Sequence, residues 1–222
     1  MELAWERLIV ALDLDDREKM ESIVKALSPE GVKFKIGLRS FIKYGPEFVN
    51  WCRDNGGDVF LDLKLHDIPN TMKQAAAEIA RLGCWAFTIH LKAGAEALAA
   101  VKEEVSSVCK KENITMPIIL GVSELTSSNA SLEDVMKLIK LADLAGIDVV
   151  CSAKESAEIS KKYPNIKIVT PGIRGPNDAA DDQKRVMTAQ QAFSQGSTYI
   201  VVGRPIIGKT DYLTAAEEIL SH

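Results

Sequence analysis

The sequence predicts an α/β protein of the (β/α)8 (TIM) barrel class, and three observations support that prediction. Eight short runs rich in valine and isoleucine alternate with stretches whose apolar residues recur at helical spacing. The chain has 222 residues, a usual length for eight such units closed into a barrel. The turn after the first run, residues 13–16, lacks the glycines that an open, doubly wound nucleotide-binding sheet carries there. We therefore expect a single catalytic barrel domain over residues 1–222.

The expected strands are short and almost continuously apolar, as strands covered by helices are. In chain order they cover residues 8–14, 31–37, 58–64, 84–91, 117–123, 148–154, 166–170 and 197–203. Helices are expected over 17–27 and around 72–80 and 135–142, where apolar residues form one stripe. Ser131 has the position and chemistry of an N-cap, and Pro69 suits the first turn of its helix.

Composition narrows the class of protein. Hydrophobic residues make up 46% of the chain and charged residues 26%, which is typical of a soluble globular enzyme and excludes disorder. The net charge of −4 gives no basic footprint for nucleic acid, and no apolar run reaches the roughly 18 residues of a membrane span. The four cysteines are widely spaced, without a CxxC pair, so we expect reduced thiols and a cytoplasmic location.

Active sites of such barrels lie at the carboxyl ends of the strands, so polar residues there are the candidates for chemistry. On the third run, Asp62 and Lys64 are two residues apart, and strand alternation predicts that both face the barrel mouth. Leu61, Leu63 and Leu65 are then expected on the opposite face, toward the helices. Lys35 lies toward the end of the second run that is nearer the mouth, Asp13 lies near the end of the first, and Ser123 ends the fifth. Asp67 follows the Asp62–Lys64 pair directly.

Each of these residues also has a purely structural interpretation. The structural alternatives are a salt bridge between Asp62 and Lys64, a helix-capping acid at Asp67 and a solvated surface lysine at Lys35. His66 is expected to orient neighbours or face solvent and not to bind a metal, and a hydrogen-bonded core histidine is one of the interpretations of His90. Asp62, His66 and Asp67 offer ligands for a divalent metal, but two nearby lysines oppose a cation.

The end of the chain is typical of a phosphate site. Gly203-Arg204-Pro205 follows the eighth run, where this fold usually holds phosphate, and Pro205 suits the start of a short helix. Arg204 offers a planar fork for phosphate oxygens. The long polar segment 171–183 before it is expected to act as a lid. A glycine turn with a surface arginine, and an ordinary surface loop, remain the alternatives.

Taken together, these motifs resemble the orotidine 5′-monophosphate decarboxylase family. The similarity rests on LDLKLHDIPNT around Asp62-x-Lys64-x-x-Asp67, supported by ALDLD, KFKIG, TPGIR, DQKRV and VVGRPI in the order that the family has them. Asp-x-Lys-x-x-Asp alone also occurs in sugar-phosphate decarboxylases and synthases of the same superfamily, whereas HDIPNT and the TPGIR–DQ loop favour the nucleotide enzyme. One departure is Leu65, where many relatives carry phenylalanine.

The resemblance implies conversion of orotidine 5′-monophosphate to uridine 5′-monophosphate and CO₂, without metal or organic cofactor. It implies a homodimer with shared sites, in which Lys64 donates the proton within an array of Lys35, Asp62, Lys64 and the partner's Asp67. The implied substrate-binding residues are Asp13, Lys35, Asp62, Lys64, Asp67, Ile68, Thr71, Ser123, Pro171, Arg174, Gln183, Gly203 and Arg204. The alternatives are a metal-dependent sugar-phosphate decarboxylase or synthase, and a barrel that binds nucleotides without catalysis.

Overall fold

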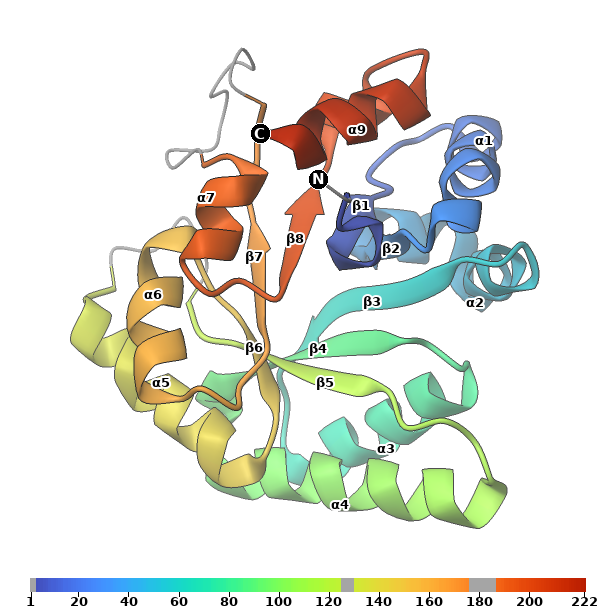
Figure 1. The fold of residues 1–222 in the computed structure, drawn as a ribbon. Coiled ribbons are helices and arrows are strands. Elements are labelled where there is room, and N and C mark those ends of the chain that lie inside the picture. Colours follow the sequence, from blue (N-terminus) through green and yellow to red (C-terminus); the bar gives the residue numbers. More distant parts are fainter. Residues whose placement is uncertain (1–2, 125–129, 176–186) are drawn as a thin grey trace.

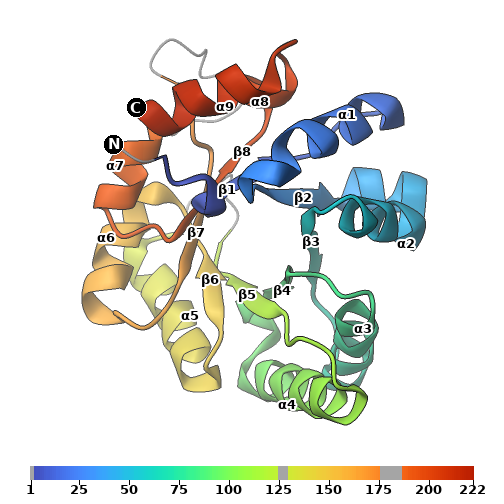
Figure 2. The ribbon, with the colours of Figure 1, turned by 45° about the vertical axis from the view of Figure 1, so that its right-hand side comes forward.

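The computed structural model describes residues 3–124, 130–175 and 187–222, and in it eight parallel strands form a closed barrel. Each strand pairs with the next in the sequence, and β1 also pairs with β8 to close the sheet. Figures 1 and 2 show the strands at the centre and the helices around them. The predicted (β/α)8 class is therefore confirmed.

Every strand lies within, or overlaps by all but one residue, a run that the sequence indicated. The strands are β1 (Leu8–Ala11), β2 (Lys33–Gly37), β3 (Asp58–Leu65), β4 (Ala86–His90), β5 (Ile118–Val122), β6 (Asp148–Val150), β7 (Ile168–Pro171) and β8 (Tyr199–Val202). The expected sixth strand over 148–154 was too long, because Ser152 already caps the next helix in a capping box with Glu155.

Helices fill the connections between strands, and two more follow the last strand. They are α1 (Arg17–Leu27), α2 (Leu38–Asp54), α3 (Pro69–Arg81), α4 (Ala95–Glu112), α5 (Leu132–Ala145), α6 (Ala153–Lys162), α7 (Ala189–Ser194), α8 (Arg204–Ile207) and α9 (Tyr212–Ser221), with short 3-10 turns at Trp5–Arg7, Ser28–Glu30 and Leu91–Ala93. The predicted start signals are confirmed: Ser131 accepts a hydrogen bond from the Asp134 amide, and Pro69 opens α3. A kink at Gly45, ahead of Pro46, divides α2.

Two apolar layers hold the barrel together. The larger one lies between strands and helices and includes Leu61, with Leu63 and Leu65 packed against it, as strand alternation predicted. The smaller one fills the barrel interior with Ile9, Ala11, Phe60, Ala86, Leu120, Val169 and Val201. Burying the isoleucine, phenylalanine, leucine and valine side chains of this layer contributes about 1.5–3 kcal/mol each, and the layer closes the barrel interior below the mouth.

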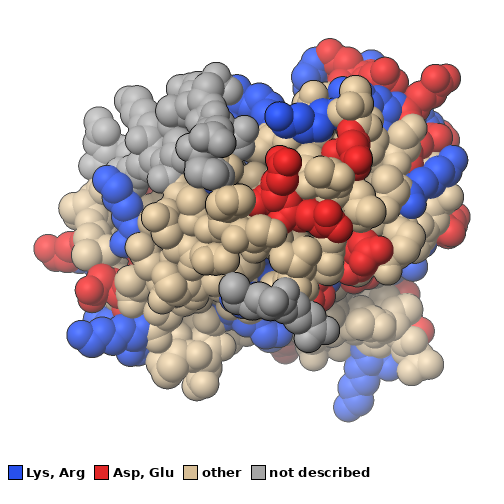
Figure 3. Space-filling model, turned by 45° about the horizontal axis from the view of Figure 1, so that its top comes forward, with Lys and Arg blue, Asp and Glu red and all other residues tan. Residues whose placement is uncertain are grey.

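Charged side chains are spread over the outer surface. Figure 3 shows lysine and arginine scattered along the edges of the face drawn, with a group of acidic side chains near its middle. Among the described helices, none combines the length and the apolar character that crossing a bilayer requires.

Candidate active site

A cavity of about 450 Å³ opens at the carboxyl ends of the strands, which we call the mouth of the barrel. Its polar lining comes from seven of the eight strands or the residues just after them: Asp13, Lys35, Asp62, Lys64, Glu124, Ser152, Arg174 and Arg204. Its floor includes Ala11, Phe60 and Val201 of the interior layer. The packed interior is therefore followed, at the carboxyl ends of the strands, by a cavity lined with charged residues, which is where the active sites of this fold lie.

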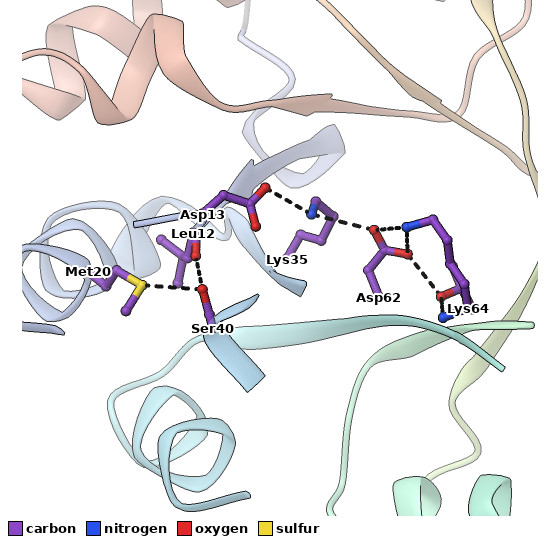
Figure 4. Close-up of polar contacts among 8 residues, drawn as sticks. Leu12, Asp13, Met20, Lys35, Ser40, Asp62 and Lys64 are labelled. Atoms are coloured by element: carbon purple, nitrogen blue, oxygen red, sulfur yellow. Dashed lines mark hydrogen bonds and ion pairs between the residues drawn. The ribbon is translucent and has the colours of Figure 1, made fainter. Parts of the chain in front are cut away.

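Four charged side chains of alternating sign cross this cavity in a row (Figure 4). Lys35 Nζ lies 3.3 Å from an oxygen of Asp13 and 3.5 Å from an oxygen of Asp62. Lys64 Nζ donates to both oxygens of Asp62 at 2.9 Å. Asp62 is thus held between two ammonium groups, and the row runs Asp13, Lys35, Asp62, Lys64.

The central carboxylate is buried yet remains charged. The side chains of Asp62 and Lys35 are 12% and 13% exposed, against 32% for Lys64. Burial by itself raises the pKa of Asp62, but the nearby Lys35 and Lys64 ammonium groups and the hydrogen bonds from Lys64 and Thr88 outweigh it, so the pKa of Asp62 lies below its usual value. The cavity therefore holds the ionised carboxylate of Asp62 beside the partly exposed ammonium group of Lys64.

An irregularity of β3 places Lys64. Its φ of 53° is a left-handed conformation, and the pairing of β3 with β4 shifts register between Leu61 and Leu65. The Lys64 amide does not continue the ladder but donates to the hydroxyl of Thr88 at 2.9 Å. Asp62 and Lys64 do share the mouth, as predicted, although a bulge and not simple alternation directs the lysine.

The turn after β1 fixes Asp13. The Leu12 amide donates to the Lys35 carbonyl at 2.9 Å, and the buried Ser40 hydroxyl donates to the Leu12 carbonyl at 2.6 Å (Figure 4). A Cβ on Gly37 would lie 2.9 Å from Asp13 Oδ1 and 3.3 Å from Lys35 Nζ. The bare backbone of Gly37 therefore leaves the space in which Asp13 meets Lys35.

Two arginines line the side of the cavity that follows β7 and β8. Arg174 is buried, and its amide donates to the Met187 carbonyl at 3.1 Å, next to a bridge between Ile173 and Met187. Arg204 opens the short α8, with Gly203 as its N-cap and Pro205 in its first turn, as the sequence predicted. Pro171 and Gly203 line the same side. Two guanidinium groups at one wall form a setting for a phosphate dianion.

Four other residues predicted to bind substrate do not line this cavity within a single chain. Asp67, Ile68 and Thr71 are exposed between the end of β3 and the first turn of α3, where Asp67 accepts a hydrogen bond from the Ile68 amide at 2.7 Å. Ser123 is buried just after β5. Gln183 and most of the lid expected over residues 171–183 lie outside the described residues, which exclude 176–186.

The two histidines beside the mouth form a pair of rings. Their centroids lie 5.1 Å apart, and His90 Nδ1 is buried without a hydrogen-bond partner, which argues against the interpretation of His90 as a hydrogen-bonded core residue. Burial, followed by the nearby His66, Lys64 and Lys92, lowers the pKa of His90. In the described part of the chain, no group of three or more His, Cys, Asp or Glu side chains is placed to hold a metal ion.

Sequence reasoning missed several polar residues at this end of the barrel. Glu124 and Ser152 each line the cavity two residues beyond the last residue of β5 or β6. Glu124 forms an ion pair with Lys92 at 2.7 Å. Thr88 lies within β4, where a β-branched residue is typical of any strand and gives no signal of its own. Following strand alternation past the ends of β5 and β6 indicates the first two.

The chain is similar in sequence to known proteins along nearly its whole length. The profile of the "Orotidine 5'-phosphate decarboxylase / HUMPS family" matches residues 6–219. Orotidine 5'-phosphate decarboxylase of Pseudoalteromonas translucida (strain TAC 125) is 40% identical over 214 residues, 90% of each chain. The enzyme of that name from Coxiella burnetii (strain RSA 331 / Henzerling II) is 40% identical over 232 residues, 99% of this chain and 97% of the relative.

Solved structures give the same answer for the fold. The crystal structure of orotidine 5'-phosphate decarboxylase from Lactobacillus acidophilus superposes with a TM-score of 0.82 at 33% identity, covering 96% of this chain and 97% of the other. An uncharacterized conserved protein from Geobacillus kaustophilus superposes with a TM-score of 0.83 at 28% identity, covering 96% and 98%. The chain belongs to the orotidine 5'-phosphate decarboxylase / HUMPS family.

Proposed function

We propose that this chain is an orotidine 5′-phosphate decarboxylase, a carboxy-lyase that converts orotidine 5′-monophosphate to uridine 5′-monophosphate and CO₂ in the last step of pyrimidine synthesis. The observation that carries the proposal is the pair of Asp62 and Lys64 at the mouth, 2.9 Å apart and flanked by Lys35. The relatives of that name, 40% identical over nearly the whole chain, support it.

The chemistry follows from the fixed charges. When the bond between the ring carbon and the carboxylate breaks, CO₂ leaves and its electron pair stays on a ring carbon that delocalises it poorly. The Lys64 ammonium stabilises that developing charge and then transfers a proton to the carbon. The neutral amine regains its proton from water before the next turnover. No step needs a metal ion, because one lysine supplies both the positive charge and the proton.

Asp62 contributes by its position beside Lys64. Its carboxylate is ionised and buried, so it faces the substrate carboxylate with like charge until CO₂ departs. It also fixes the ammonium of Lys64 through two hydrogen bonds, which removes freedom that would otherwise be lost during the reaction.

The rest of the cavity holds the parts of the substrate that do not react. We assign Asp13 and Lys35 to the ribose, Ser123 to the base, and Arg174, Gly203, Arg204 and Gln183 to the phosphate, with Pro171 lining the same wall. Gripping a dianion at a distance lets binding energy organise the site for the chemical step.

A second copy of the chain completes the site in this proposal. Asp67, Ile68 and Thr71 carry exposed side chains just beyond β3 and do not line the cavity of their own chain. Leu38 and Ile42, at the start of α2 beside the neighbouring strand, are 52% and 79% exposed, and Ile68 is 64% exposed. Covering these apolar side chains with a partner would also bring the partner's Asp67 to the array of Lys35, Asp62 and Lys64.

A cytoplasmic location fits the state of the thiols. All four cysteines are free and buried, and burial raises the pKa of Cys52 and Cys84 to about 12. Such thiols are inert packing groups and form no disulfides, which suits a reducing compartment.

A spectrophotometric assay tests the proposal. Purified protein is mixed with orotidine 5′-monophosphate, and the loss of the orotate absorbance and the release of CO₂ are followed with and without EDTA. We expect turnover that the chelator leaves unchanged. Strict dependence on added Mg²⁺, with activity on a sugar phosphate in place of the nucleotide, would instead identify a metal-dependent lyase of the same superfamily. Tight binding of uridine 5′-monophosphate without turnover would leave a non-catalytic nucleotide-binding barrel.

A further inference from the structure

One buried hydroxyl on β4 contacts both members of the Asp62–Lys64 pair. Thr88 is 1% exposed, and its Oγ1 donates to Asp62 Oδ1 at 3.0 Å while accepting the Lys64 backbone amide at 2.9 Å. Only a group that both donates and accepts makes these two bonds through one atom. The β-branched side chain also has few χ1 rotamers, so the position of the oxygen is well defined.

The register shift between β3 and β4 explains why a side chain takes this role. Leu61 pairs with Phe87 and Leu65 pairs with Ile89, so residues 62–64 of β3 face the single residue Thr88 of β4. A regular ladder has no carbonyl to offer the Lys64 amide at such a bulge. The Thr88 hydroxyl takes the place of that carbonyl while Lys64 holds its left-handed φ of 53°.

We propose that Thr88 is a positioning residue, whose hydroxyl holds the bulge of β3 and the Asp62 carboxylate in the one arrangement that presents the Lys64 ammonium to the reacting carbon. This role rests on the proposed function, since it concerns the catalytic step of that reaction. Thr88 itself does not line the cavity and need not touch the substrate.

The consequences of losing the hydroxyl are specific. Without it, Asp62 loses a donor that favours its charged form, and the Lys64 amide loses its acceptor. The bulge is then free to adopt other backbone conformations, which moves Lys64 Nζ away from the carboxylate. Binding of the phosphate by Arg174 and Arg204 on the far wall does not depend on this contact, so affinity for the nucleotide changes less than the rate.

Three variants of the intact protein separate positioning from packing. Thr88→Val keeps the shape and removes the hydroxyl, whereas Thr88→Ser keeps the hydroxyl and removes a methyl group. Thr170→Val is the matched control, because it removes a buried threonine hydroxyl on β7 whose partner, at 2.6 Å, is Ser197 and not a member of the array. For each variant we would measure kcat, KM, the pH dependence of kcat, the melting temperature and the pKa of Asp62 by carbon NMR without substrate.

We expect Thr88→Val to lower kcat about 10- to 100-fold with KM changed less than about threefold. Its Asp62 should titrate at higher pH than in the wild type, moving the acid limb of the kcat profile upward. Thr88→Ser should recover most of kcat, and Thr170→Val should keep both kcat and the Asp62 titration. A wild-type kcat and an unmoved Asp62 titration in Thr88→Val would overturn the proposal, as would equal losses in all three variants that track melting temperature.

The two proposals fail in different ways in this experiment. If the wild type does not decarboxylate the nucleotide, the proposed function fails, while the NMR titration still reports whether Thr88 controls Asp62. If the wild type turns over and Thr88→Val matches it in both measurements, the positioning role fails and the proposed function stands.

Discussion

The two ends of the barrel carry cavities of opposite character. The larger, about 770 Å³, lies at the amino-terminal ends of β3, β4 and β5, which we call the base, and its charged lining residues Arg53, Asp58 and Arg81 are exposed. The smaller, about 450 Å³, lies at the mouth and holds the buried Asp62 among its charges. Cavity volume therefore does not locate the chemistry, whereas opposite charges held together under partial burial do.

The lysines of β2 give the same contrast on one strand. Lys33 and Lys35 point to the same face, two residues apart, but only Lys35 reaches two carboxylates within 3.5 Å. Lys33 lies 3.9 Å from the exposed Asp58, donates to the Gly31 carbonyl at 3.1 Å and lies 5.3 Å from the Trp85 ring. Burial lowers the pKa of Lys33, with Asp58 and Glu6 opposing that change only partly. The lysine at the base is thus buried with a single carboxylate 3.9 Å away, whereas the lysine at the mouth belongs to an ion-pair array.

The largest effect is expected at the mouth, from Lys64→Ala. Removing the proton donor and the charge beside the reacting carbon should lower kcat by at least about 1,000-fold, with little change in the melting temperature because Lys64 is not in either apolar layer. Steady-state kinetics and thermal unfolding measure both. Arg53→Ala, in the cavity at the base, is the matched control and should leave kcat unchanged. Near-normal turnover by Lys64→Ala would remove the lysine from the mechanism.

Arg204→Ala should have the next largest effect. A charge-assisted hydrogen bond to phosphate contributes about 1.5–3 kcal/mol, so kcat/KM should fall about 10- to 100-fold. Because phosphate binding organises the site, kcat and affinity should fall together. Titration with uridine 5′-monophosphate separates the binding loss from the rate loss. An unchanged kcat/KM would take Arg204 out of the phosphate site.

The sequence predicts which residues lie at the mouth of the barrel better than it predicts the contacts that they make there. Period-two alternation correctly placed Asp62 opposite Leu61, because the leucine face packs under the helices and fixes the register. The left-handed φ of Lys64 was not foreseeable, since nothing in the letters of β3 marks a bulge. Asp13 joined the row through hydrogen bonds between β1, β2 and the buried Ser40, which are contacts between distant segments.

The position of Asp67 relative to the active site could not be predicted from the sequence either, because it depends on how two copies of the chain associate. Asp67 follows Asp62 and Lys64 so closely that sequence alone suggests a common site. The strand ends at Leu65, however, and Asp67 turns to its own Ile68 amide on the exposed loop. Its proposed role at the site of a second chain rests on the exposed surface around it, and the spacing of residues along the chain carries no information about that surface.

A smaller effect on rate is expected from Gly37, the last residue of β2, and none from Gly31, which lies two residues before that strand. Gly37→Ala puts a Cβ 2.9 Å from Asp13 Oδ1, so it should disturb the Asp13–Lys35 pair and lower kcat/KM by up to about tenfold, with stability nearly unchanged. Gly31 has a φ of 80° and open space around it, so Gly31→Ala should cost about 1 kcal/mol of stability and leave kcat/KM unchanged. Steady-state kinetics and urea unfolding of both variants test whether Gly37→Ala lowers kcat/KM and Gly31→Ala lowers stability. Equal behaviour of the two glycines would contradict the assignment of function to the mouth.

The smallest effect on activity is expected from Lys33→Met, which should keep kcat and KM. Replacing a buried cation by an apolar side chain of similar length should leave the free energy of unfolding unchanged or raise it by about 1 kcal/mol near pH 7. Because the pKa of Lys33 in the folded chain lies below the 10.5 of the unfolded chain, the unfolded state binds more protons between those two values, and wild-type stability rises with pH there. The advantage of Lys33→Met should therefore shrink as the pH approaches about 10.5, which urea titrations near pH 7 and about pH 10 measure. A large loss of stability or of turnover in Lys33→Met would show that the base needs this charge as much as the mouth needs Lys35.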